Sequence, residues 1–419
     1  MNYRYSGAAA IALVISALSL TIWRGTATPA LTDTALATEP PTTASSALSS
    51  TAFLVVAGGG TPAYNEIALE KNVQYFQRTL AHLERELTAA TVFFANGNTD
   101  EATVRYLDLF GRERFKVPDI PHLAGAANAE NVRTWLTAYP QTELGREHCP
   151  AFLYFTGHGW LNEENPNDNA LILWEEALLS VQTLAQTLDQ WPVETPFVTM
   201  MAQCYAGALA NLIYEGGDPS QPVSAQSRCG FFATIKTRPS VGCTPLVNEA
   251  DYRDYSSSYF AGLSGRDRVG NPVASTDYNQ DGEVSFAEAH AFAKIDGETS
   301  DWPISTSEAW LQRQVSPAER NRALAQSIKD WLAVARPEQQ AVMGQLAEKL
   351  GYDLEAPFNT LAIPESTFLG TSQEVLEAYH MRLKMTLLAV AAEGIIRDRN
   401  APEEVAILNQ LLTCEAGTW

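Results

Sequence analysis

Short apolar runs that alternate with amphipathic stretches limit the fold of this sequence more than any other feature. Five runs have the length and composition of buried strands, namely residues 51–60, 90–97, 150–159, 195–204 and 230–237. The segments between them place apolar residues three and four positions apart, which is typical of helices that pack one face on a core. Strands that alternate with helices predict a parallel sheet covered by helices on both faces. We therefore expect an α/β fold whose functional residues lie at the carboxyl ends of the strands.

The pattern changes in the last quarter of the chain. Residues 316–335, 337–352 and 372–398 have helical periodicity, with proline and glycine between them. We therefore expect two folded parts: an α/β domain with a mostly parallel sheet sandwiched by helices over residues 52–314, and a helical C-terminal subdomain over residues 315–419. The helical part contains no motif that indicates chemistry.

Residues 1–27 have the pattern of a signal peptide or a membrane anchor. Arg4 precedes an apolar run over residues 8–23, and small residues that suit a signal peptidase follow. The run is slightly long for a signal peptide and short for a full membrane span, so export and N-terminal anchoring are both consistent with it. Residues 28–51 are rich in Thr, Ser, Ala and Pro without periodicity, which indicates a flexible linker. We expect an exported protein, periplasmic or extracellular.

The sequence is strongly acidic, with 28 Lys and Arg against 49 Asp and Glu and a net charge of −21. A surface with this charge repels phosphate backbones, so we expect no nucleic-acid partner. The same charge favours divalent metal ions and cationic substrates. Hydrophobic residues make up 46% of the chain, which is enough for a packed core.

The chain contains five cysteines: Cys149, Cys204, Cys229, Cys243 and Cys414. Export permits disulfides, and an odd number of cysteines leaves at least one free thiol. Cys229 and Cys243 are the closest pair and lie in one segment, so a disulfide between them is the pairing we expect. The alternative is that all five thiols are reduced.

Two of the predicted strands end in residues that together can perform nucleophilic catalysis. His158 ends the run FLYFTGHG between two glycines, and Cys204 ends the run FVTMMAQC beside small residues. Adjacent parallel strands lie about 5 Å apart, so side chains at their ends can meet. A neighbouring imidazole increases the thiolate fraction of a cysteine or removes its proton during attack. The backbone N–H groups of Gly159 and Cys204 are suited to bind the oxyanion that forms.

Each of these residues also has an ordinary structural explanation. Cysteine is among the residues most often buried as a small apolar side chain, and a histidine between glycines can simply occupy a turn. The matched position of His158 and Cys204 at two strand ends favours the catalytic interpretation.

The two strand ends resemble those of the caspase-like cysteine peptidases, the superfamily of caspases, metacaspases and legumains. YFTGHG is similar to the histidine strand of legumain, and CYAG matches the Cys-x-x-Gly of metacaspases and legumains. VVAGGGTPAYNEIALEKNVQYF resembles the first strand and helix of bacterial legumain-like proteins, and the likeness extends over residues 52–311. The resemblance implies a caspase-like fold in which His158 is the general base, Cys204 the nucleophile and Gly159 part of the oxyanion site.

The sequence departs from this superfamily just before the predicted nucleophile. Two positions before the cysteine, caspases carry Gln and legumains an acidic residue, and each helps to shape the specificity pocket. This chain has Ala202 there, with Gln203 next to Cys204. Cleavage after Asp or Asn is therefore not implied. The segment DWPISTSEAW, residues 301–310, is a candidate specificity loop.

Residues 277–288, DYNQDGEVSFAE, fit the twelve-residue calcium loop of an EF-hand. The predicted ligands are Asp277, Asn279, Asp281, the carbonyl of Glu283, and Glu288 at positions one, three, five, seven and twelve. A helical pattern follows the loop and none precedes it, so we expect one Ca²⁺ that braces the structure. An acidic turn that binds no ion is the alternative.

These features together predict an exported, calcium-braced cysteine endopeptidase that acts on protein or peptide substrates. Two alternatives stay open. A catalytically inactive caspase-like module would bind calcium and partners at the cell surface, although it would not need both His158 and Cys204. A transpeptidase would use the same dyad, because an amine can resolve an acyl-enzyme as water does. The sequence indicates no oligomeric state.

Overall fold

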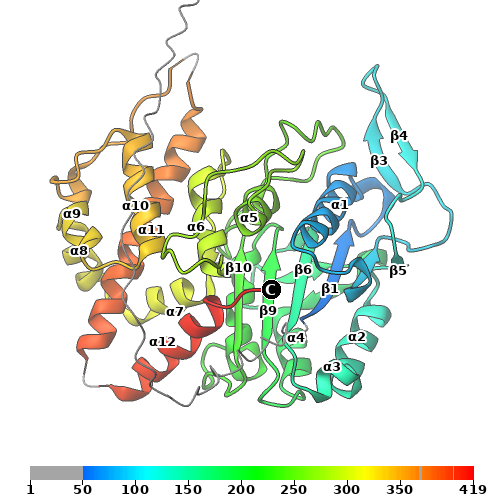
Figure 1. The fold of residues 1–419 in the computed structure, drawn as a ribbon, viewed down its shortest axis with the longest axis horizontal. Coiled ribbons are helices and arrows are strands. Elements are labelled where there is room, and N and C mark those ends of the chain that lie inside the picture. The colour runs from blue at the N-terminus through cyan, green and yellow to red at the C-terminus, as the bar shows by residue number, and fades with distance from the viewer. Residues whose placement is uncertain (1–50, 368–369, 400) are drawn as a thin grey trace, which may run out of the picture. The chain divides into compact units, whose positions relative to one another are not determined.

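A mostly parallel β-sheet lies between layers of helices (Figure 1). The computed structural model describes residues 51–367, 370–399 and 401–419, all of which belong to one compact unit. The strands are β1 (Ala52–Gly58), β2 (Ala90–Phe94), β3 (Val104–Leu107), β4 (Glu113–Lys116), β5 (Leu123–Gly125), β6 (Ala151–Trp160), β7 (Ala170–Ile172), β8 (Leu178–Ser180), β9 (Phe197–Met201), β10 (Arg228–Phe232) and β11 (Ile304–Ser305). In these described residues, nine strands form the main sheet, and its central order is β11-β10-β9-β6-β1-β2-β5.

The strand pairing confirms the predicted α/β class. β1 pairs in parallel with β2 and β6, and β6 pairs in parallel with β9, which pairs in parallel with β10. The short strand β11 is antiparallel to β10, and β7 is antiparallel to the end of β6. A separate hairpin, β3-β4, has no counterpart in the predicted pattern.

The helices are α1 (Ile67–His82), α2 (Ala129–Ala138), α3 (Glu143–Arg146), α4 (Val181–Leu188), α5 (Tyr255–Ser264), α6 (Phe286–Asp296), α7 (Thr306–Gln314), α8 (Pro317–Leu324), α9 (Ile328–Leu332), α10 (Pro337–Leu350), α11 (Gln373–Asp398) and α12 (Pro402–Glu415). Short 3₁₀ segments include η1 (Pro62–Tyr64) and η5 (Ala206–Ile213).

The sequence pattern predicts an α-helix over residues 205–217, but the 3₁₀ segment η5 occupies most of that range. At the start of η5, the N–H groups of Tyr205 and Gly207 donate to the carbonyls of Arg238 and Thr234 in the loop after β10.

The two faces of the sheet carry separate cores, as the alternation of side chains along a strand requires. In β1, Phe53 and Val55 point to the face covered by α1, α5 and α6. Leu54 and Val56 point to the other face, which is covered by α2 and α4. Every residue of β1 is buried, as expected for a strand in the middle of a parallel sheet.

The C-terminal helices contribute to the same cores as the sheet. Met385 of α11 belongs to the apolar core on the sheet face that α2 and α4 cover. Trp419 belongs to the core on the opposite face, where it packs against Phe53 and Phe76. Further clusters join α6 to α10 and α11, and α7 to α12. The helical C-terminal region is therefore packed against the α/β part over a large apolar surface.

A disulfide joins Cys229 of β10 to Cys414 of α12, with the two Cα atoms 6.0 Å apart. The expected pairing of Cys229 with Cys243 is wrong. The bonded cysteines are 185 positions apart in the sequence, so their proximity cannot be read from it. They meet because α12 packs against β10. Cys149, Cys204 and Cys243 are free thiols.

The described chain contains no helix that is both long enough and apolar enough to span a bilayer. The predicted signal or anchor over residues 1–27, and all of the predicted linker except Thr51, lie outside the described residues.

Candidate active site

The carboxyl ends of β6 and β9 lie side by side. The two strands pair in parallel up to Phe155 and Met201, and the N–H of Ala202 donates to the carbonyl of Phe155. His158 lies three residues after Phe155, and Cys204 lies three residues after Met201. The structure therefore brings both predicted catalytic residues to the same edge of the sheet, where chemistry collects in folds of this class.

Gly159 lies directly against the backbone of Cys204. A Cβ atom added to Gly159 would come within 2.0 Å of the carbonyl oxygen of Cys204, closer than any real contact. Only glycine therefore allows the end of β6 to approach the turn after β9. Tyr205, the residue after the predicted nucleophile, has a φ of +60°, so the chain turns sharply at this point.

A carboxylate holds the imidazole of His158. The Nε2 atom of His158 lies 3.0 Å from Oε2 of Glu66 and 2.9 Å from the carbonyl oxygen of Tyr64. The Glu66 side chain is only 5% exposed, and its other oxygen accepts a 2.6 Å hydrogen bond from Arg105. Burial raises the pKa of Glu66. The hydrogen bond and charge of His158 and the hydrogen bond of Arg105 outweigh this effect, so the pKa lies below its usual value and the carboxylate is ionised.

A second thiol, that of Cys243, also lies at His158. Ligand atoms of Glu66, His158 and Cys243 all lie within 4.8 Å of one another. Burial lowers the pKa of His158, but interactions with Cys243 and with the ionised Glu66 outweigh this effect and raise the pKa above its usual range. The imidazole is therefore protonated at neutral pH. Burial also raises the pKa of the Cys243 thiol, which is therefore neutral.

Cys204 has partners of its own. Its Sγ accepts a hydrogen bond from the N–H of Ser240 at 3.3 Å, and in the described part of the chain no hydrogen bond joins Cys204 to His158. The segment that carries Ser240 also carries Cys243, so one loop contacts both strand ends. Cys204 is half-buried and Cys243 is exposed, so solvent reaches the site.

The segment 301–310 supports the loop that contacts Cys204. Oδ1 of Asp301 accepts the N–H of Val241 at 2.9 Å. The guanidinium carbon of Arg238 lies 3.9 Å from the ring centroid of Trp302, and the carbonyl of Arg238 accepts the N–H of Tyr205. Residues 301 and 302 thus lie beside the candidate site, but residues 304–310 form β11 and the first part of α7 and are mostly buried, so the segment is not the loop that the sequence suggests.

Sequence reasoning missed Glu66 and Cys243. Glu66 has the ordinary appearance of an acidic residue before a helix, and it is the N-cap of α1. One weak signal was available: Glu66 follows the first apolar run, and the carboxyl ends of parallel strands share one edge of a sheet. That β1 is the direct neighbour of β6 is known only from the structure. For Cys243 the sequence contains no such signal, because it lies in a loop without regular structure.

The predicted calcium loop has the backbone turns of such a site. The carboxylate of Asp277 accepts the N–H groups of Asp281 and Gly282, and Gly282 has a φ of +93°. Glu288 instead caps its own helix, with Oε2 accepting from the backbone and hydroxyl of Ser285. Oε1 of Glu288 accepts the N–H groups of Tyr278 and Asn279, so this carboxylate already lies against the loop, although the ligand oxygens of Asp277, Asp281 and Glu288 do not all lie within 4.8 Å of one another.

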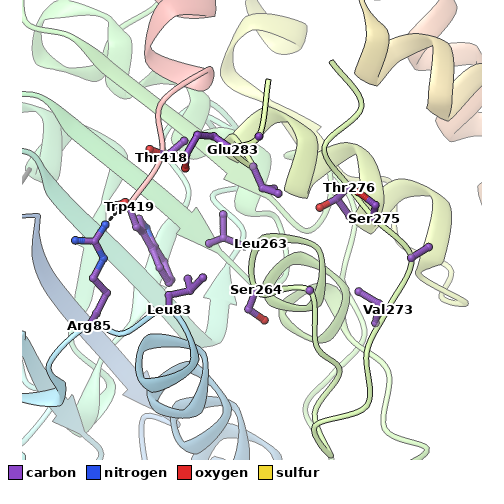
Figure 2. Close-up of a pocket in the computed structure, with 14 residues that line it drawn as sticks. Leu83, Arg85, Leu263, Ser264, Val273, Ser275, Thr276, Glu283, Thr418 and Trp419 are labelled. Carbon is purple, nitrogen blue, oxygen red and sulfur yellow. Dashed lines mark hydrogen bonds between the residues drawn. The ribbon is translucent and has the colours of Figure 1, made fainter. Parts of the chain in front are cut away.

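A cavity of about 430 Å³ adjoins the predicted calcium loop (Figure 2), and its lining includes neither His158 nor Cys204. Glu283 of the loop, Leu263 and Ser264 of α5, and Arg85 line it together with Trp419. Arg85 donates a hydrogen bond to the carbonyl of Trp419, which ties the end of α12 to the segment after α1. The described contacts around this cavity indicate packing rather than chemistry.

No known protein family matches this chain, and no curated protein is significantly similar to it.

Proposed function

We propose that this chain is a cysteine endopeptidase with a caspase-like fold, in which His158 and Cys204 form the catalytic dyad. One observation carries the proposal: two neighbouring parallel strands end at the same edge of the sheet in an imidazole and a thiol. The ionised Glu66 adds support, because a nucleophile, a base and a group that orients the base are the recurring parts of such sites.

In the proposed reaction the Cys204 thiolate attacks the carbonyl carbon of a peptide bond. The oxyanion accepts hydrogen bonds from the N–H groups of Gly159 and Cys204. The C–N bond then breaks, and protonated His158 gives its proton to the leaving amine. Water attacks the resulting thioester while His158 takes a proton from it, which releases a carboxylic acid and restores the thiolate. Glu66 stabilises the imidazolium in both steps.

Cys204 is the better nucleophile candidate of the two thiols near His158. It lies in the turn after the core strand β9, and its backbone packs against Gly159, whose N–H is one of the two proposed oxyanion donors. Cys243 lies on a loop beyond the imidazole, and its Sγ lies 3.7 Å from the carbonyl oxygen of Gly157. The sheet therefore fixes the position of Cys204, whereas the position of Cys243 depends on a loop without regular structure.

We also propose that residues 277–288 bind one Ca²⁺ through Asp277, Asn279, Asp281, the carbonyl of Glu283, and Glu288. Oxygen donors of this kind are the ligands that calcium prefers. The folded backbone of the loop supports this assignment, and the ion would brace the start of α6.

Export to the periplasm or the extracellular medium completes the proposal. A disulfide in the core is favoured in oxidising compartments, and extracellular calcium is abundant enough to fill a modest site. The net charge of −21 supports protein or peptide substrates over nucleic acid.

Covalent labelling separates the two thiols. A peptidyl electrophile that mimics the scissile carbonyl should label the wild type at Cys204, and Cys204→Ala should lose both labelling and proteolysis while it melts like the wild type. Cys149→Ala, a free cysteine at the opposite end of β6, is the matched control and should keep both. Proteolysis that survives in Cys204→Ala would overturn the assignment.

A further inference from the structure

The group formed by Glu66, His158 and Cys243 contains one more potential ligand than a His-Cys dyad needs. It provides an oxygen, a nitrogen and a sulfur atom from three separate segments, all within 4.8 Å of one another. Glu66 precedes α1, His158 ends β6 and Cys243 lies in the loop after β10. Such convergence is not required for peptide cleavage, which uses one thiol.

The donor set selects a particular class of metal. Imidazole nitrogen and thiolate sulfur suit Zn²⁺ and related transition metals, whereas calcium and magnesium prefer oxygen alone. Zinc bonds to nitrogen and oxygen at about 2.0–2.2 Å and to sulfur at about 2.3 Å, so tetrahedral ligand atoms lie roughly 3.3–3.7 Å apart. His158 Nε2 and Glu66 Oε2 lie 3.0 Å apart, and the remaining separations fall below 4.8 Å. Small side-chain rotations therefore bring all three atoms to bonding distance.

The surroundings suit a metal ligand set. Glu66 is held by Arg105, whose 2.6 Å hydrogen bond to the free carboxylate oxygen fixes the orientation of the group. A hydrogen-bonded partner of this kind is typical behind metal-binding carboxylates. The site is also accessible, because the His158 side chain is 23% exposed and Cys243 is exposed.

We propose that Glu66, His158 and Cys243 form a Zn²⁺ site, and that zinc bound there inhibits the enzyme by occupying His158. The inhibitory part rests on the proposed peptidase function, because an imidazole bound to Zn²⁺ through one nitrogen and protonated at the other has no free lone pair with which to act as a base. The binding part stands on the three ligands alone. Cys243 has no role in peptide cleavage and serves as the ligand that makes the enzyme sensitive to zinc.

The binding experiment uses the full-length protein and does not depend on activity. Zn²⁺ affinity is measured by competition with a chromophoric chelator, and Co²⁺ serves as a spectroscopic substitute whose charge-transfer band reports a thiolate ligand. The wild type should bind one equivalent and display the band. Cys243→Ser should lose the band and bind Zn²⁺ more than about 100-fold more weakly, because loss of a ligand costs at least as much as loss of a group that only hydrogen-bonds to a ligand.

Matched variants locate the site. Cys149→Ser, the same substitution at the other end of the sheet, and Cys204→Ser should both keep the band, and Glu66→Gln should weaken Zn²⁺ binding without abolishing the thiolate band. Each variant is first checked for a native melting transition, and Glu66→Gln decides the outcome if Cys243→Ser does not fold. Absence of zinc binding in the wild type, or a band that disappears with Cys204→Ser and not with Cys243→Ser, would overturn the proposal.

Activity assays then test inhibition. Zinc should inhibit proteolysis by the wild type and leave Cys243→Ser at least about 10-fold less sensitive. A protein that binds zinc but cleaves no peptide would refute the peptidase function and keep the metal site. A protein that cleaves peptides and is inhibited equally with and without Cys243 would refute the inhibitory site and keep the peptidase.

Discussion

Oε2 of Glu66 lies 3.0 Å from Nε2 of His158, although 92 residues separate the two in the chain. The contact arises because β1 and β6 are parallel neighbours, so the segment after β1 returns to the edge where β6 ends. Arg105 holds the second oxygen of Glu66, which leaves the first aimed at the imidazole.

Glu66→Gln should lower kcat by roughly 10- to 100-fold with little change in KM. A charge-assisted hydrogen bond contributes about 1.5–3 kcal/mol, and each 1.36 kcal/mol of barrier is a factor of ten in rate. Steady-state kinetics on a peptide substrate measure the effect. Glu113→Gln is the control. Glu113 forms an ion pair with the other terminal nitrogen of Arg105 at 3.1 Å, but its side chain is far more exposed than that of Glu66. An equal loss of activity in both variants would count against a direct role for Glu66.

Removal of the Cys229–Cys414 disulfide should destabilise the fold by about 2–5 kcal/mol, since the bond closes a loop of 185 residues. Cys414→Ala should melt several degrees below the wild type. A reducing agent should lower the melting temperature of the wild type to that of the variant and leave the variant unchanged. If the reducing agent affects both proteins equally, another disulfide is responsible.

Calcium should raise the melting temperature by roughly 3 °C or more at a hundredfold excess over its Kd, because binding then contributes about 2.7 kcal/mol. Asp281→Ala should abolish the shift, since it removes a ligand oxygen and its charge at position five. Glu283→Gln should retain it, because Glu283 offers its backbone carbonyl. Thermal melts with calcium and with chelator measure the difference, and identical melts for the wild type would refute the site.

Asp301→Asn should become more stable relative to the wild type as the pH rises. Burial raises the pKa of Asp301 to about 7, and the hydrogen bond from Val241 and the charge of Arg382 offset only part of this effect. The carboxyl of the unfolded chain ionises near pH 4, so between pH 4 and 7 the folded state binds more protons and loses stability as the pH rises. The Asn variant lacks this loss.

The stability difference between Asp301→Asn and the wild type should therefore grow by roughly 2–3 kcal/mol between pH 5 and pH 8. Urea denaturation at the two pH values measures it. A difference that stays constant or shrinks would mean that Asp301 is ionised in the folded state throughout this range. The Asp301 carboxyl is relevant to the candidate active site because it accepts the N–H of Val241, in the loop whose Ser240 contacts Cys204.

The sequence by itself predicted the parallel sheet and the places of His158 and Cys204. Buried strands such as β1 and β6 are continuous apolar runs followed by glycines, although β6 continues through its glycines to Trp160. Those signals are local, so they can be read without coordinates. The order of the strands and the identity of their neighbours cannot be read in this way, because many pairings bury the same apolar surface.

The tertiary structure alone decided what surrounds the imidazole and which cysteines pair. Glu66 looks like a helix N-cap and Cys243 like a loop residue, and only the folding of three distant segments onto one edge makes them neighbours of His158. Cys229 bonds to Cys414 for the same reason, since α12 returns to β10. Local sequence patterns encode secondary structure and burial, whereas contacts between distant segments depend on how whole elements pack together.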